Sequence, residues 1–232
     1  MHILLTRPIE DCYEMIEKFK LLGHEVSHLP LISIKGLEHE TISYSDYKAI
    51  IFTSSNAIKF LDLKNIDKKI NCFCVGNATE KKAKSVGFQN IFAAEGNVNN
   101  LKELILQNFP SSEGKLLYVS GEITSTDFDQ QLILEGYIVY RIVNYRATSV
   151  KMFDDKLIEK MKLNMPEITY IYSQNSAISF LNLIKNYHLE KLCMNTNLMC
   201  ISEKTSSVLN EIKWKKIFLF NPGEEEFLLY KI

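Results

Sequence analysis

The sequence predicts an α/β fold of two similar lobes, each a parallel sheet flanked by helices, joined by a two-stranded β linker. Three observations predict it: short apolar runs recur, segments with helical spacing lie between them, and one series of motifs occurs twice. Apolar runs of strand length are typical of strands buried on both faces of a parallel sheet. Their alternation with helices indicates right-handed crossovers.

Each expected element has its own signal. Polar residues after the strands act as helix caps, and Gly23, Gly87 and Gly136 are expected to end helices. The expected strands are residues 3–5, 49–52, 72–75, 116–119, 168–172, 198–201 and 217–220. The expected helices, with apolar residues three or four apart, include residues 9–22, 98–108, 153–161 and 177–184.

The chain shows an internal duplication. Any two βα units look alike, but three matches in the same order indicate a repeated lobe. The second match pairs Phe52 with Tyr172. The matched segments are residues 2–26 with 115–139, residues 52–61 with 172–181, and residues 72–92 with 198–218.

Two lobes need a connection, and two extended segments are expected to provide it. Residues 31–36 follow Pro30, and residues 137–145 are too long and β-rich to end within one lobe. We expect these segments to be adjacent, so that the first lobe is discontinuous. The expected division is residues 1–32 with 148–232 as the first lobe, residues 38–140 as the second, and residues 33–37 and 141–147 as linker strands.

Composition and charge exclude several classes of protein. Lys and Arg number 27 and Asp and Glu 28, so the basic excess typical of a duplex-DNA binder is missing and no nucleic-acid partner is expected. No run approaches the ~20 apolar residues of a membrane span. The odd number of cysteines, 5, fits reduced thiols better than a disulfide framework. We therefore expect a soluble, cytoplasmic protein without a membrane partner, by default a monomer.

Motifs for metals and nucleotides are also missing. The histidines lack ligand spacing, and no second cysteine pair supports a zinc site at Cys72 and Cys74. The sequence has no phosphate loop, no Gly-x-Gly-x-x-Gly and no Gly-x-Ser-x-Gly. No metal is expected, and a generic nucleotide-binding enzyme is a poorly supported alternative.

Polar clusters follow the strands, at the carboxyl ends where open α/β sheets bind ligands. Amides, hydroxyls and positive helix ends there bind carboxylates without many arginines. Helix capping explains any single cluster equally well, but together they predict an anion-binding surface if the lobes face each other. The clusters are residues 6–7, 53–56, 76–79, 120–122, 173–176 and 202–205.

The clusters resemble the successive motifs of the uroporphyrinogen-III synthase family. The motifs are Leu-Leu-Thr-Arg-Pro at residues 4–8, Ile-Phe-Thr-Ser-Ser-Asn-Ala at 51–57, Cys-Val-Gly-Asn-Ala-Thr at 74–79 and Tyr-Ser-Gln-Asn-Ser-Ala at 172–177. The resemblance covers nearly the whole chain. It implies a bilobed protein with a cofactor-free active site between the lobes.

The activity that the resemblance implies is that of a cyclising hydro-lyase of tetrapyrrole (heme) biosynthesis. Such an enzyme converts the linear tetrapyrrole hydroxymethylbilane to uroporphyrinogen III, with loss of water and inversion of the last pyrrole ring. The implied partners are this small polycarboxylate substrate and, transiently, the preceding deaminase. The protein's main task would be to position the chain ends for closure.

The resemblance also implies residue roles. Tyr172 is expected to assist departure of the hydroxyl, because a phenol with a pKa near ~10 is protonated at neutral pH. Arg7 is expected to make a charge-assisted contact with substrate, and Glu122 to orient a donor. The other expected substrate-binding residues are Thr53, Ser54, Ser55, Asn56, Gly76, Asn77, Thr79, Gly121, Ser173, Gln174, Asn175 and Ser176.

One segment departs from the family pattern. Ser202 and Glu203 stand where the family usually has Gly and Pro. An acidic residue at a helix start competes with a substrate carboxylate for the same amides. A catalytically silent, synthase-like tetrapyrrole-binding module therefore remains the alternative.

Overall fold

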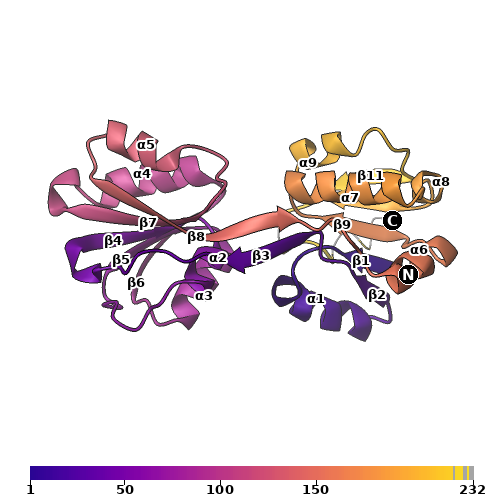
Figure 1. The fold of residues 1–232 in the computed structure, drawn as a ribbon, viewed down its shortest axis with the longest axis horizontal. Helices are drawn as coiled ribbons and strands as arrows, with labels where there is room; N and C mark the ends of the chain where they lie inside the picture. The colour runs from indigo at the N-terminus through magenta and orange to yellow at the C-terminus, as the bar shows by residue number, and fades with distance from the viewer. Residues whose placement is uncertain (222, 227–228, 230–232) are drawn as a thin grey trace. The chain divides into compact units, whose positions relative to one another are not determined.

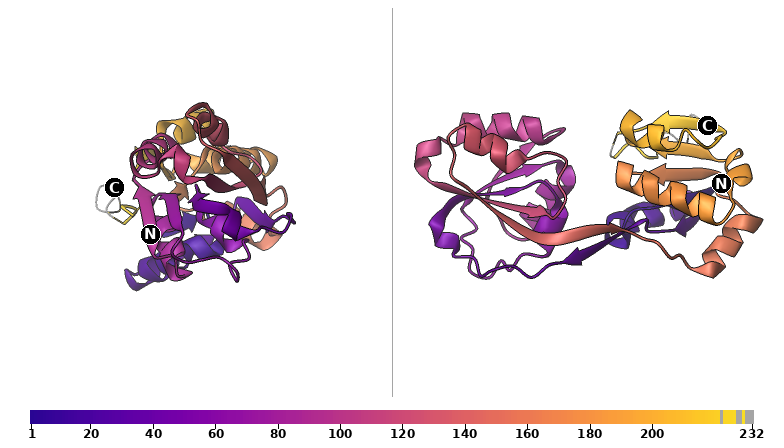
Figure 2. Two further views of the ribbon diagram at one scale, coloured as in Figure 1. Left: turned by 90° about the vertical axis from the view of Figure 1, so that its left-hand side faces the viewer. Right: turned by 45° about the horizontal axis from the view of Figure 1, so that its top comes forward.

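The structure, a computed structural model, describes residues 1–221, 223–226 and 229 (Figure 1). Contacts divide the chain into two compact units. The first unit contains Met1–Ser33 and Thr148–Ile232, and the second contains Ile34–Ala147. Parallel sheets with helices on both faces confirm the predicted α/β class (Figure 2).

Within the described residues, the first unit has a five-stranded sheet of order β11-β10-β9-β1-β2, in which every pair is parallel. The strands are β1 (His2–Leu5), β2 (Glu25–His28), β9 (Ile168–Ile171), β10 (Asn197–Cys200) and β11 (Lys216–Leu219). The helices are α1 (Ile9–Leu21), α6 (Asp155–Leu163), α7 (Gln174–Asn186), α8 (Glu190–Cys193) and α9 (Glu203–Val208).

The second unit has a six-stranded sheet of order β3-β8-β7-β4-β5-β6. The strands are β3 (Ile32–Gly36), β4 (Tyr47–Phe52), β5 (Asn71–Val75), β6 (Asn90–Ala94), β7 (Lys115–Gly121) and β8 (Val139–Ser149). The helices are α2 (Ser55–Lys59), α3 (Asn77–Ser85), α4 (Val98–Asn108) and α5 (Phe128–Leu134), with 3-10 turns η1 (Tyr44–Asp46) and η2 (Ser111–Glu113).

The segments expected as linker strands belong to this second sheet. β3 and β8 are hydrogen-bonded neighbours at its edge. Beyond β3, the amide of Leu37 donates to the carbonyl oxygen of Asn144 over 2.8 Å. Pairing in the sheet satisfies backbone groups that two free-standing strands would leave to water.

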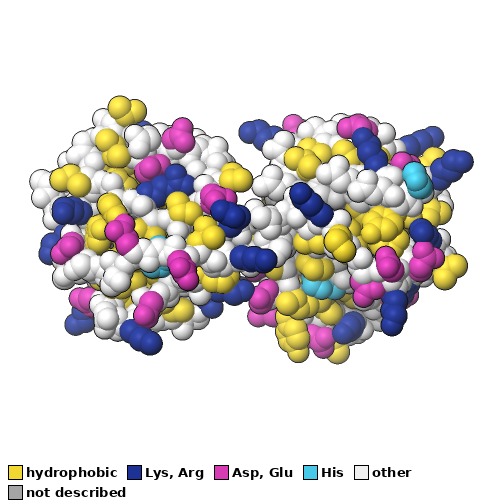
Figure 3. Space-filling view, in the orientation of Figure 1, with side chains coloured by type: hydrophobic (Ala, Val, Ile, Leu, Met, Phe, Trp, Pro, Cys, Tyr) yellow, Lys and Arg dark blue, Asp and Glu magenta, His cyan; other side chains and the backbone are white. Residues whose placement is uncertain are grey.

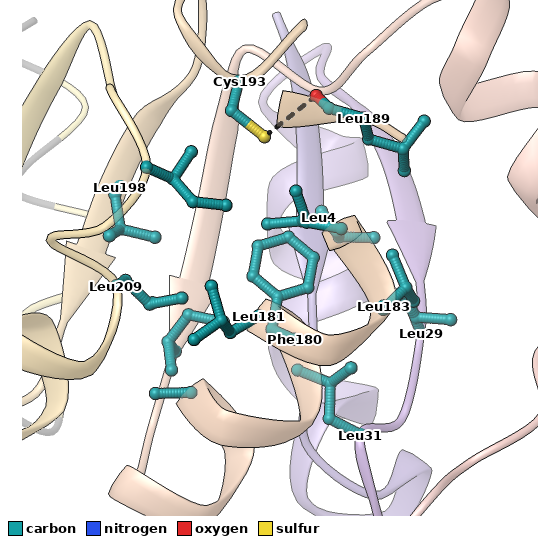
Figure 4. Close-up of a cluster of buried hydrophobic side chains, with 14 of the residues drawn as sticks. Leu4, Leu29, Leu31, Phe180, Leu181, Leu183, Leu189, Cys193, Leu198 and Leu209 are labelled. Atoms are coloured by element: carbon teal, nitrogen blue, oxygen red, sulfur yellow. Dashed lines mark hydrogen bonds between the residues drawn. The ribbon is translucent and has the colours of Figure 1, made fainter. Parts of the chain in front are cut away.

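Both faces of each sheet are buried. In the first unit, Leu4, Phe180 and Leu198 belong to the cluster on one face (Figure 4), and Leu5 and Phe19 belong to the cluster under α1 on the other. Because the central strands β1, β9 and β10 are buried along their whole length, helices can cover both faces of this sheet. The carboxyl ends of the strands are then the places left for polar groups.

The surface mixes charges of both signs. Figure 3 shows lysine and arginine side chains interspersed with aspartate and glutamate on the face in view, which matches a formal net charge of -1. Among the residues that the structure describes, no helix combines the length and the apolar character needed to cross a membrane.

The two sheets share one strand order. β7, β8, β4, β5 and β6 take the places in the second unit that β1, β2, β9, β10 and β11 take in the first. In chain order of the first unit this is 2-1-3-4-5, whose topological switch point lies between the first and third strands. The switch points are therefore β1/β9 in the first unit and β7/β4 in the second.

The strand register identifies equivalent residues and corrects the second sequence match. Leu5 pairs with Tyr170 across β1/β9, and Tyr118 pairs with Ile51 across β7/β4. The residue two positions after Tyr170, Tyr172, is therefore equivalent to Thr53.

Phe52 was the wrong partner for Tyr172 because side chains alternate between the faces of a strand. The Phe52 side chain is buried among residues under α2 and α3, whereas Tyr172 packs with the cluster under α1. The helix caps agree with the corrected register, since Ser54 caps α2 and Ser173 caps α7.

Candidate functional site

A pocket of about 310 Å³ lies in the second unit, at the carboxyl ends of β4 and β7. This is the switch point of the sheet, where ligands of open α/β folds bind. The lining residues are Thr53, Ser54, Val75, Asn97, Val98, Tyr118, Gly121, Ile123, Thr124, Ser125, Thr126 and Tyr145. None of these residues is acidic or basic.

Hydroxyl groups are the main polar groups of the pocket. Thr53 Oγ1 and the Tyr118 hydroxyl lie 3.2 Å apart and share a hydrogen bond. The Thr126 hydroxyl is buried without a partner. Burial raises the pKa of Tyr118, against smaller opposing effects of Thr53 and Arg141, so its phenol is protonated at neutral pH and can donate.

Local structure places the two hydroxyls. β4 ends at Phe52 and the Ser54 hydroxyl accepts from the amide of Asn56 over 3.2 Å, which starts α2 and leaves Thr53 between strand and helix. Tyr118 is almost fully buried in β7, with its ring edge-on to Phe128. Thr53 and Tyr118 meet because β4 and β7 are neighbours in the sheet.

Gly121, at the end of β7, makes room for an aromatic wall. A Cβ atom at Gly121 would lie 2.7 Å from Cζ of Tyr145, closer than such contacts occur. The amide of Glu122 donates to the carbonyl oxygen of Tyr145 over 2.9 Å. The absence of a side chain at Gly121 therefore lets the Tyr145 ring lie against this strand end.

Two arginines hold the loop after β7. Arg141 Nε donates to Ser120 Oγ over 2.9 Å and Arg141 Nη2 donates to the Gly121 carbonyl oxygen over 3.1 Å. Arg146 donates to both carboxylate oxygens of Glu122, over 2.7 and 2.5 Å. Glu122 is thus paired with an arginine of its own unit, and its expected role in orienting a donor to substrate stays a prediction.

In the first unit, Arg7 and Tyr172 lie together at the β1/β9 switch point. The Arg7 Cζ atom is 5.0 Å from the centre of the Tyr172 ring, a cation–π distance. Arg7 also pairs with Asp11 over 3.2 Å, and its carbonyl oxygen lies 2.8 Å from Nε2 of His28. Two predicted site residues from distant parts of the sequence are therefore neighbours.

The Tyr172 hydroxyl is a protonated donor with a weak partner. Burial raises the pKa of Tyr172 above the ordinary tyrosine value, Glu225 and Cys12 act in the same direction, and Arg7 opposes them. The hydroxyl donates to the thioether of Met15 over 3.3 Å. Because a thioether is a weak acceptor, a substrate oxygen could replace it.

The other predicted residues of the first unit lie at the start of α7. The Ser173 hydroxyl accepts from the amide of Ser176 over 3.0 Å and caps the helix. Gln174 and Asn175 are exposed in the first turn, whereas Ser176 is buried. Their role in substrate binding stays a prediction.

The other predicted residues of the second unit lie at two helix starts. Ser55 and Asn56 are half-buried in the first turn of α2. Gly76 precedes α3 with φ of 79°, a left-handed conformation that favours glycine. Asn77 is exposed and Thr79 is buried. Of the predicted residues in this unit, Thr53, Ser54 and Gly121 line the pocket.

Several residues that line the pocket were not expected from the sequence. Tyr118 lies inside an apolar run that indicates core, Tyr145 lies in a segment expected as linker, and Asn97 caps α4. The polar residues 124–126, three to five positions after the glycine that ends a buried strand, were the available signal. Within the described part of the chain, no cluster of His, Cys, Asp and Glu could hold a metal ion.

Comparison with known proteins shows which family the chain belongs to. The family model described as uroporphyrinogen-III synthase HemD matches residues 13–219. The chain is 22% identical over 246 residues to the uroporphyrinogen-III synthase of Escherichia coli (strain K12), a match that covers 99% of this chain and 98% of that protein.

A longer relative matches as well. The chain is 26% identical over 220 residues to the porphyrin biosynthesis protein HemD of Ruminiclostridium josui. That match covers 88% of this chain but 42% of the relative, so the chain spans less than half of that protein's length.

Solved structures show the same fold. Uroporphyrinogen-III synthetase from Helicobacter pylori 26695 matches with a TM-score of 0.64 and 18% identity, covering 100% of this chain and 99% of that one. A mutant uroporphyrinogen III synthase from the extremely thermophilic bacterium Thermus thermophilus matches with a TM-score of 0.54 and 12% identity, covering 100% and 97%.

Proposed function

The chain belongs to the uroporphyrinogen-III synthase family, and we propose that it acts as a uroporphyrinogen-III synthase, a cyclising hydro-lyase of tetrapyrrole (heme) biosynthesis. In this reaction the linear hydroxymethylbilane closes to uroporphyrinogen III, the last pyrrole ring is inverted, and one water is lost. The family match across residues 13–219 is the observation that carries the proposal.

The first chemical step needs a donor for the departing hydroxyl, and Tyr172 is suited to it. The carbon–oxygen bond of the terminal hydroxymethyl group breaks, and the pyrrole N–H gives up its proton, so that water and an azafulvene form. A protonated phenol can stabilise the departing oxygen by donating a hydrogen bond. The raised pKa of Tyr172 and its weak thioether partner support this role.

The remaining steps depend on positioning. Attack on the azafulvene forms a spiro-pyrrolenine, which reopens with the last ring inverted before closure. The hydroxyls and helix-start amides of both units are donors for the acid arms of the substrate. Holding the two chain ends near each other makes closure with inversion faster than closure in solution without it.

The test is the isomer composition of the product. The full chain is added to porphobilinogen and a deaminase, and the type I and type III isomers are separated. We expect type III to increase well above the level formed by the deaminase alone. An isomer ratio equal to that of the deaminase-only control would end the proposal.

The alternative, a silent tetrapyrrole-binding module, is favoured by one observation. Glu203 is the first residue of α9, directly after the Ser202 cap, where its carboxylate competes with an anionic ligand. Such a module would bind tetrapyrrole acids in calorimetry and leave the isomer ratio unchanged.

We also propose an oligomeric state, a compartment and a partner for the enzyme. We place a cofactor-free monomer in the cytoplasm, where it receives its substrate from the preceding deaminase through a transient contact at most. The 5 cysteines are all free and buried, which supports a reducing compartment.

A further inference from the structure

We propose that the pocket at the β7/β4 switch point holds one acid-bearing pyrrole ring of the substrate, with the Tyr118 and Thr53 hydroxyls donating to a carboxylate arm. This inference rests on the proposed function for the identity of the ligand. The residues that carry it all lie in the second unit. Tyr118 was not among the residues that the family resemblance implied.

The size of the pocket limits the ligand to a small group. A volume of about 310 Å³ is at the lower end of the ~300–1,000 Å³ of small-molecule sites. That is room for one heteroaromatic ring with a short acid arm, and too little for a chain of four pyrroles. The pocket therefore fits one end or one ring of a linear tetrapyrrole.

The Thr53 and Tyr118 hydroxyls can donate hydrogen bonds to a ligand. Thr53 and Tyr118 carry two hydroxyl protons, and their mutual hydrogen bond over 3.2 Å uses one of them. One proton is free for a ligand, and a carboxylate, which is a stronger acceptor than a hydroxyl, can take the second proton from the mutual bond, so that both hydroxyls donate to it. The Thr126 hydroxyl is also buried without a partner, and a carboxylate can accept more than one hydrogen bond.

The charge around the pocket favours an anion. No lining residue is acidic, and the Arg141 guanidinium lies 5.9 Å from the centre of the Tyr118 ring. The pocket wall includes Asn97 and Val98, the start of α4, whose first turn contains no acidic residue. The positive end of this helix therefore adds to the field of the arginine.

The pocket also has an apolar part that suits ring carbons. Val75, Val98 and Ile123 line it together with the Tyr145 ring. Small-molecule sites commonly combine such apolar walls with a few converging polar groups. An aliphatic acid alone would leave the apolar wall in water, whereas a pyrrole with an acid arm uses both parts.

The experiment uses porphobilinogen, a single pyrrole with an acetate and a propionate arm, as the probe. Its affinity for the full chain is measured by calorimetry, and its contacts by ligand-observed NMR. We expect Tyr118→Phe/Thr53→Val to bind about tenfold more weakly, because both charge-assisted donors are lost. Each single variant should bind about threefold more weakly, because one hydroxyl proton remains.

Tyr137→Phe is the matched control. It makes the same chemical change in the same unit and removes a buried hydroxyl that donates to the carbonyl oxygen of Phe109 over 2.7 Å, but it does not line the pocket. Its affinity for the probe should equal that of the wild type. Circular dichroism checks that every variant folds. If the double variant does not fold, the probe affinities of the two single variants decide the test.

The outcomes separate this inference from the proposed function. Equal probe affinity in the wild type and the folded pocket variants overturns the inference, as does a wild type that does not bind the probe at all, even if type III isomer is formed. An unchanged isomer ratio together with probe binding that depends on Tyr118 and Thr53 overturns the synthase activity and leaves the pocket assignment standing.

Discussion

The two units carry side chains of very different size at equivalent positions of one sheet topology. At its switch point the first unit has Tyr172 and Arg7, stacked at 5.0 Å. By strand register the second unit has Thr53 and Ser120 at the same places. The smaller pair leaves the hydroxyl-lined pocket of about 310 Å³. The fold determines where a site lies, and side-chain volume determines what it can hold.

Anchoring of the loop after the first strand is common to both units. His28 of β2 binds the carbonyl oxygen of Arg7, and the equivalent residue of β8, Arg141, binds Ser120 and Gly121. In both units a side chain of the neighbouring strand therefore holds this loop, whereas the loop's own side chains differ. The first unit has a phenol suited to hydrogen-bond donation, and the second has a pocket suited to binding.

The largest expected effect is a loss of stability at high pH, and it comes from buried thiols, which both units contain. Burial raises the pKa of Cys12 in the first unit and Cys74 in the second to about 11. An unfolded thiol ionises near pH ~8.5, so the unfolded state binds fewer protons above that pH and stability falls as pH rises. We expect a loss of about 1.4 kcal/mol per buried thiol per pH unit between pH 9 and 11.

Urea unfolding at pH 8 and pH 10 measures this loss. The fluorescence of Trp214 reports the first unit, where its ring stacks on Phe180, and far-UV circular dichroism reports both units. Both signals should shift to lower urea at pH 10. Unfolding midpoints that coincide at the two pH values would show that the thiols are not buried as described.

The next largest effect separates catalysis in the first unit from binding in the second. Tyr172→Phe should lower kcat about a hundredfold, the range for loss of one donor that stabilises a developing charge on oxygen, and change KM less than about threefold. Steady-state kinetics in the isomer assay measure both constants. Tyr13→Phe is the control, because Tyr13 is an exposed tyrosine of the same unit. An unchanged kcat would remove Tyr172 from the chemistry.

A steric change in the second unit should have an intermediate effect. In Gly121→Ala the new methyl group meets the Tyr145 ring, so we expect a loss of about 2 kcal/mol in the free energy of unfolding. Gly121→Ala/Tyr145→Ala should recover part of it, because the clash is relieved. A double variant no more stable than the single one in urea unfolding would contradict this contact.

The smallest expected effect comes from substituting the glycines of the two matching turns, and it shows whether these turns are equivalent. Gly23 and Gly136 occupy matching turns with φ of 81° and 87°, and a Cβ atom added at either glycine would have no neighbouring atom within 4 Å. Gly23→Ala and Gly136→Ala should therefore each cost about 1 kcal/mol, from the left-handed backbone alone. Thermal unfolding gives both values, and clearly unequal costs would break the equivalence.

Most of the elements and their order follow from the sequence alone, although β2, β6 and α8 lie outside the ranges that it predicted. Apolar runs and helical stripes predict them because a strand buried on both faces is apolar throughout, whereas a helix buried on one side is apolar with a period of 3.6 residues. The stripe of Cys12, Ile16 and Phe19 is the buried side of α1. The polar ends of the strands, including Thr53, Ser54 and Gly121, are also visible in the sequence, because helix starts need capping groups.

Only the tertiary structure shows which of these groups line the same pocket. The pairing of Phe52 with Tyr172 looked right locally, but a one-residue shift exchanges the two faces of a strand, and the shift is visible only in the pairing with β1 and β7. From the sequence, Tyr118 looks like a core residue. In the structure, β4 places the Thr53 hydroxyl next to the Tyr118 hydroxyl. Contacts between segments far apart in the chain, such as Gly121 with Tyr145, depend on sheet register, which local sequence patterns do not specify.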